Sequence, residues 1–142
     1  MYDRRTLLAT GGLALAGLVA GCSDSSSEEP TTTGASTYGV DMTDGLKFDP
    51  AELSVAAGDT VVWETVGTVG HSVTAYGARI PEDAPFFASG GFDAESAART
   101  AYPDGRIIGG DAYEHTFEVA GRYAYFCVPH ERAGMRGTIE VG

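Results

Sequence analysis

The segment "GRYAYFCVPHERAGMRGTIEV", residues 121–141, decides the fold of this chain because it encodes two strands and the loop that joins them. Apolar and polar or small residues alternate in "GRYAYF" and again in "GTIEV", which is the period of a half-buried β-strand. Between these runs, nine residues contain a thiol, an imidazole and a thioether, on Cys127, His130 and Met135. The pair of strands therefore presents three side chains with donor atoms on one short loop.

Further short runs with the same period recur from Tyr38 onward, separated by Gly, Pro and Asp. About seven strands of this length, with turn signals between them, predict an all-β sandwich or barrel. In "TVVWETV", the alternation places Val61, Trp63 and Thr65 on one face, and we expect Trp63 in the core. The remaining runs are "LKF" at 46–48, "AELSVAAGD" at 51–59, "HSVTAY" at 71–76 and "EHTFEV" at 114–119.

Residues 77–110 interrupt this strand pattern. Within them, "DAESAARTAY" at 93–102 has small or apolar residues at helical spacing and a candidate N-cap in Asp93. We therefore expect one short helix inside a long excursion between two strands. The sequence shows no internal repeat and no second domain.

The N-terminal segment, residues 1–21, has the pattern of a signal peptide. The pair Arg4 and Arg5 precedes about 15 small and apolar residues at 7–21, a run that is short for a membrane-spanning helix. The twin arginine resembles the signal of the pathway that exports folded proteins. A chance arginine pair in an ordinary export signal is the alternative.

The signal ends in "VAGC", residues 19–22, which resembles a lipobox and predicts cleavage before a lipidated Cys22. The alternative is a small-residue cleavage site beside a chance cysteine. Residues 22–37 are rich in Ser and Thr and lack a large aliphatic side chain, so they predict a flexible tether to a domain at 38–142. We expect an extracytoplasmic protein anchored to the outer face of the cell membrane.

The net charge of the chain argues against polyanionic partners. The chain has 142 residues and a formal net charge of −11, which argues against nucleic acid or anionic lipid as a partner reached by charge attraction. Lys47 is the only lysine, and Asn and Gln are absent, a composition typical of proteins from salt-loving organisms. An acidic protein from ordinary conditions is the alternative.

Three interpretations fit the donor loop, which we define as residues 127–135. Cys127 has no cysteine partner in an exported chain if Cys22 is lipidated, so a disulfide does not explain it. A thiolate nucleophile activated by histidine leaves Met135 without a role, and a buried thiol beside a core methionine is the structural interpretation. A thiolate, an imidazole and a thioether together form the donor set that suits copper in both oxidation states.

A trigonal copper site with two histidines, one cysteine and a weak axial methionine needs a second histidine, and only His71 and His115 remain. His71 follows the Gly-rich turn "TVGTVG" at the beginning of a predicted strand, where a ligand can lie at the end of a sandwich. His115 lies in the strand run "EHTFEV", where packing or solvent exposure is expected. The pattern favours His71, with His115 as the alternative.

The run "YFCVPHERAGM", the upstream "GHSV" and the turn "VAAGDTVVW" together resemble the blue copper proteins, the cupredoxins. The C-x₂-H-x₄-M spacing is similar to that of the plastocyanin and pseudoazurin type, and the lipobox, acidity and long excursion resemble halocyanin in particular. The resemblance implies a Greek-key β-sandwich with one copper, held by His71, Cys127 and His130 as equatorial ligands and by Met135 as axial ligand. Ser72 and Val128 stand where relatives often have Asn and Ser or Thr linking the two ligand loops.

The same resemblance implies a monomeric one-electron carrier that cycles between Cu(II) and Cu(I) and catalyses no reaction of its own. Its expected partners are a redox protein donor and acceptor, among membrane respiratory components. A copper-binding chaperone or storage protein is the alternative, and it would bind Cu(I) without intense colour.

Overall fold

The computed structural model describes residues 35–142 of the chain. The predicted signal peptide, Cys22 and the tether up to residue 34 lie outside the described residues. Among residues 35–142, no helix has the length and hydropathy needed to cross a bilayer.

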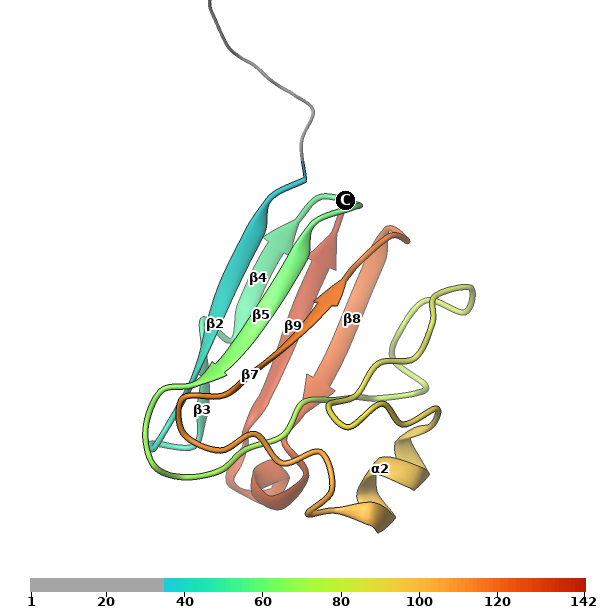
Figure 1. Ribbon diagram of the computed structural model, residues 1–142. Coiled ribbons are helices and arrows are strands. Elements are labelled where there is room, and N and C mark those ends of the chain that lie inside the picture. Colours follow the sequence, from blue (N-terminus) through green and yellow to red (C-terminus); the bar gives the residue numbers. More distant parts are fainter. Residues whose placement is uncertain (1–34) are drawn as a thin grey trace, which may run out of the picture. The chain divides into compact units, whose positions relative to one another are not determined.

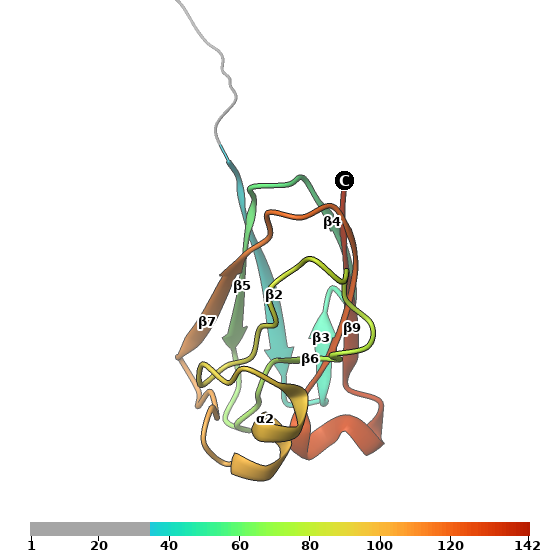
Figure 2. The same cartoon turned by 90° about the vertical axis from the view of Figure 1, so that its right-hand side faces the viewer.

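The described residues form two four-stranded sheets that pack face to face (Figures 1 and 2). The first sheet has the order β3-β2-β5-β7, and the second has the order β4-β9-β8-β6. Strand β2 runs parallel to β5, strand β4 runs parallel to β9, and the other neighbours are antiparallel. The strands are β2 (Thr37–Thr43), β3 (Lys47–Asp49), β4 (Glu52–Val55), β5 (Thr60–Thr65), β6 (Thr74–Ala75), β7 (Ala112–Thr116), β8 (Gly121–Phe126) and β9 (Arg136–Val141).

Aromatic side chains fill the space between the sheets. Trp63 is fully buried, and its ring lies 5.3 Å from that of Tyr125 and 5.8 Å from that of Tyr113, measured between centroids. Val61 and Thr65, on the same face of β5, are also buried. The predicted β-sandwich and the predicted inward face of β5 are both confirmed, because alternate residues of a strand point to the same side.

The excursion between β6 and β7 contains the one short α-helix, α2 (Glu95–Ala101). Helix α2 and the 3₁₀-helix η3 (Val128–Ala133) lie at the same end of the sandwich, opposite the C-terminus (Figure 1). The predicted Asp93 N-cap is wrong: the N-cap residue is Ala94, and its side chain makes no capping hydrogen bond.

Two strand predictions also need correction. Strand β2 was not among the predicted runs, although Val40 and Met42 on its inner face are fully buried. The run predicted as a strand at 71–76 forms only the two-residue β6 with β8. Its backbone bonds instead go to the excursion, where Ser89 donates its N–H to the carbonyl of Val73 at 2.7 Å.

Candidate metal centre

The loop between β8 and β9 brings Cys127 and Met135 together. The backbone N–H of Cys127 donates to the carbonyl of Met135 at 3.1 Å, and the N–H of Met135 donates to the carbonyl of His130 at 3.2 Å. The turn closes through Gly134, whose φ of 92° lies in the left-handed region that glycine adopts at little cost. The chain thus returns to β9 with both sulfur side chains buried.

His71 reaches the same end of the sandwich from the segment between β5 and β6. Both backbone groups of His71 pair with Ile107 of the excursion in one antiparallel bridge: His71 N–H donates at 3.1 Å, and Ile107 N–H donates back at 2.7 Å. The preceding turn is fixed by Asp44, whose carboxylate accepts the N–H groups of Thr68 at 2.9 Å and Val69 at 3.0 Å. The fully buried imidazole of His71 is therefore held by the backbone bridge to Ile107 and by the turn that Asp44 fixes before it.

Three donor atoms converge at this point. The Nδ1 atoms of His71 and His130 are 3.2 Å apart, and the Sγ atom of Cys127 lies 3.9 Å from the first and 3.4 Å from the second. A metal with bonds of about 2.0–2.1 Å to nitrogen and about 2.3 Å to sulfur, in a trigonal arrangement, requires separations of about 3.5–3.8 Å. The observed triangle matches these separations to within a few tenths of an ångström, so the donor set fits a metal ion.

Burial shifts the pKa values of two of these donors, His71 and Cys127. It lowers the pKa of His71, with a smaller contribution from the neighbouring His130. It also raises the pKa of the Cys127 thiol, against the hydrogen bonds from Ser72 that lower it. A neutral His71 imidazole is ready to bind a metal, whereas the Cys127 thiol has to lose its proton on binding.

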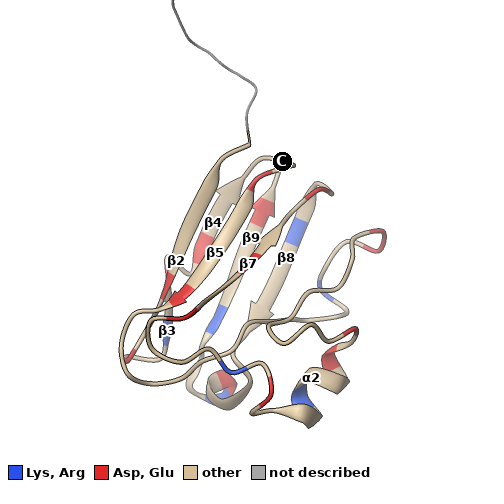
Figure 3. Ribbon diagram, viewed as in Figure 1, with Lys and Arg blue, Asp and Glu red and all other residues tan. Residues whose placement is uncertain are grey.

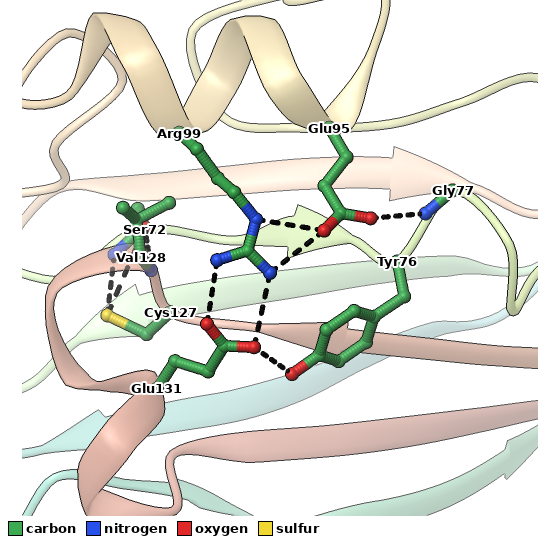
Figure 4. Close-up of polar contacts among 8 residues, drawn as sticks. All are labelled: Ser72, Tyr76, Gly77, Glu95, Arg99, Cys127, Val128 and Glu131. Atoms are coloured by element: carbon green, nitrogen blue, oxygen red, sulfur yellow. Dashed lines mark hydrogen bonds and ion pairs between the residues drawn. The ribbon is translucent and has the colours of Figure 1, made fainter.

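Ser72 links the two loops that carry the donors (Figure 4). Its Oγ accepts the backbone N–H of Val128 at 2.9 Å, and its own N–H donates to the sulfur of Cys127 at 3.3 Å. The sequence shows Ser72 and Val128 as departures from the pattern of relatives, and the structure shows that serine still makes the link.

His115 is not part of this group. Its ring stacks on Phe87 with centroids 4.6 Å apart and meets Phe117 edge-on at 4.7 Å. In the described part of the chain, the group of His, Cys and acidic residues whose donor atoms converge is His71, Cys127 and His130. The sequence-based preference for His71 over His115 agrees with this geometry.

Sequence reasoning missed the contacts that surround the donor loop. Glu131, next to His130, is paired with Arg99 of α2, and hydrogen bonds from that guanidinium lower the pKa of the carboxyl to about 2. Ile107, which pairs with His71, also carried no local signal. An ion pair between residues three or four positions apart in one helix can be predicted from the sequence. These two contacts instead join residues that are 32 and 36 positions apart.

Comparison with known proteins supports a copper-binding protein. Residues 35–142 match the model of the copper binding proteins of the plastocyanin/azurin family. A plastocyanin from Scenedesmus fuscus is 33% identical over 96 residues, covering 68% of this chain and 87% of that protein. A plastocyanin A/B from Petroselinum crispum is 30% identical over 97 residues, covering 68% of this chain and 89% of that protein.

Among solved structures, a pseudoazurin from Sinorhizobium superposes with a TM-score of 0.54 at 25% sequence identity, covering 75% of this chain and 74% of that one. The fold and the donor set define a cupredoxin. The chain belongs to the plastocyanin/azurin family of copper-binding proteins.

Proposed function

We propose that this protein is a one-electron carrier with a single type 1 copper. His71, Cys127 and His130 are its equatorial ligands, and the fully buried Met135 is its weak axial ligand. The triangle of two Nδ1 atoms and one Sγ atom, closed by the Cys127–Met135 backbone bond, carries the proposal. Copper bound by such a set cycles between Cu(II) and Cu(I).

The chain's contribution is to hold the donors still. His71 is fixed by its backbone pairing with Ile107, and Cys127 is fixed between Ser72 and Met135. A site whose ligands are already in place needs little rearrangement when its charge changes, which favours fast electron transfer. The protein makes and breaks no substrate bond in this function.

Electrons enter and leave through the His130 edge. His71 is fully buried, whereas His130 is half-buried and lies beside the exposed Pro129, Ala133 and Gly134. Pro129, Ala133 and Gly134 carry no charge, and the last two are small, so a redox partner can approach closely on this side of the loop, next to the charged Glu131 and Arg132. Acidic side chains are spread over both sheets and the loops (Figure 3), so close contact at this apolar rim, rather than charge attraction, does most of the docking in high salt.

The cellular setting is also part of the proposal. The twin-arginine signal, the lipobox and the tether support a halocyanin-like lipoprotein that is anchored through Cys22 to the outer face of the membrane of a salt-loving organism. Membrane respiratory components are its donor and acceptor, and the carrier itself is monomeric.

The visible absorption spectrum of the copper-loaded domain tests the carrier function. An intense blue band should appear on addition of Cu(II), and Cys127→Ser should abolish it. His71→Ala should bleach the protein, whereas the matched variant His115→Ala should stay blue. A colourless wild-type protein that binds Cu(I) would instead indicate a chaperone or storage role.

A further inference from the structure

Glu131 and Arg99 form a two-point ion pair between the donor loop and α2. The Nη1 atom of Arg99 lies 2.7 Å from Oε1 of Glu131, and Nη2 lies 3.2 Å from Oε2. The hydroxyl of Tyr76 donates to the same carboxylate at 2.5 Å. Glu131 directly follows His130 in η3, and its carboxylate is held by two partners, Arg99 and Tyr76 (Figure 4).

Arg99 is itself fixed on several sides. Its guanidinium contacts the carboxylate of Glu95, one turn earlier in α2, at 2.8 Å. The other oxygen of Glu95 accepts the backbone N–H of Gly77 at 2.9 Å. The guanidinium also lies 4.2 Å from the ring centre of Phe126, close enough for a cation–π contact. The position of Arg99 is thus set by α2, by the start of the excursion and by the end of β8.

Apart from the contacts of Glu131 and the His130 ring, the middle of the donor loop has no hydrogen-bonded attachment to other elements in the described part of the chain. The backbone bonds of residues 129–134 all close within the loop, as in His130 N–H to the carbonyl of Cys127 and Gly134 N–H to the carbonyl of Glu131. Within residues 35–142, the side-chain hydrogen bonds that join this stretch to other elements come from Glu131 and from the His130 ring. The ion pair of Glu131 with Arg99 therefore attaches the donor loop to α2 at the residue that follows His130.

We infer that Glu131 and Arg99 are positioning residues that clasp the donor loop to α2 and hold the His130 imidazole in place. This inference rests on the proposed function, in which His130 is a ligand. A partly exposed ion pair adds little to folding stability, so the effect is expected on the loop rather than on the whole domain. Imidazole nitrogen is a harder donor than thiolate or thioether, so a loosened His130 disfavours Cu(II) relative to Cu(I).

The reduction potentials of Arg99→Gln and Glu131→Gln in the copper-loaded protein separate positioning from plain electrostatics. By charge alone, loss of Arg99 should lower the potential and loss of Glu131 should raise it. If the pair acts as a clasp, both variants should raise the potential, and both should slow electron self-exchange several-fold. Tyr76→Phe, which changes no charge, should give a smaller shift in the same direction.

The ion pair of Arg122 and Glu140, between β8 and β9, provides the matched control. Arg122→Gln should leave the self-exchange rate unchanged. Opposite shifts in the two clasp variants, or shifts no larger than that of Arg122→Gln, would overturn the inference while the protein remains blue. A His130→Ala variant that keeps the blue band would instead overturn the ligand assignment itself.

Discussion

Removal of the Ser72 hydroxyl should destabilise the domain through the donor loop. Ser72 is only 2% exposed, and its Oγ accepts the N–H of Val128, which has no other hydrogen-bond acceptor among residues 35–142. Ser72→Ala leaves this partly buried N–H without its acceptor, and an unsatisfied buried donor lowers the free energy of unfolding by about 1–3 kcal/mol. Because a small domain is stable by about 5–15 kcal/mol, the loss should be easily measured.

Urea unfolding of the copper-free protein, followed by tryptophan fluorescence, measures this loss. Trp63 is the only tryptophan of the chain and is fully buried, so its emission reports unfolding of the core. Ser54→Ala, on the exposed face of β4, is the matched control and should change the free energy of unfolding by less than about 0.5 kcal/mol. If Ser72→Ala is no less stable than Ser54→Ala, the hydroxyl does not anchor the loop.

Four further outcomes are expected. Met135→Leu should keep the blue colour and raise the reduction potential, and Met135→Gln should lower it; loss of copper in the leucine variant would show that Met135 is a strong ligand or a core residue. Ala133→Glu should slow electron exchange with a small redox partner several-fold at unchanged potential. The control Ala97→Glu, on the exposed side of α2, should not slow it; the next residue, Ala98, is buried and would disturb packing. Hydrogen bonds from the N–H groups of Ser36 and Ala56 lower the pKa of Asp59 in the folded state, so the carboxylate's contribution to stability is complete above about pH 4 and is lost as pH falls through the lowered pKa. Asp59→Asn should therefore be less stable than the wild type at neutral pH and should lose less stability on acidification. Equal dependence of the unfolding free energy on pH in the two proteins would contradict this. Cys22→Ser should release the domain into the medium or leave an uncleaved precursor, and intact mass showing an unmodified Cys22 in membrane-bound mature protein would refute lipid anchoring.

Much of the fold was predictable because local alternation and burial agree in the central strands. In β5, Val61, Trp63 and Thr65 are buried and alternate with the more exposed Thr60, Val62 and Glu64, as the period of two predicts. Strand β2 was missed because "TYGVDMT" combines Gly39 and polar residues and continues a Ser- and Thr-rich segment. Its strand character comes from pairing with β5 over six residues, which is a long-range property of the fold.

The donor set was predictable for a different reason. Cys127, His130 and Met135 lie within nine residues, so one loop brings them together without help from the rest of the chain. The position of His71 depends on Ile107, 36 residues later, and that of the loop depends on Arg99. Nothing in the local pattern of the excursion indicates either contact, since backbone pairing and a bidentate ion pair form only when the fold is complete.

The excursion between β6 and β7 therefore contacts both loops that carry the donor residues. It supplies Ile107 to the backbone of His71, Ser89 to the backbone of Val73 and Arg99 to Glu131 beside His130. The two histidines come from loops that the sandwich alone would hold mainly at their ends. Because one excursion contacts both loops, a change within it can alter both imidazoles together while the sheets stay intact. The excursion thus contributes to the distance between the two Nδ1 atoms, together with the strands that carry the ligand loops.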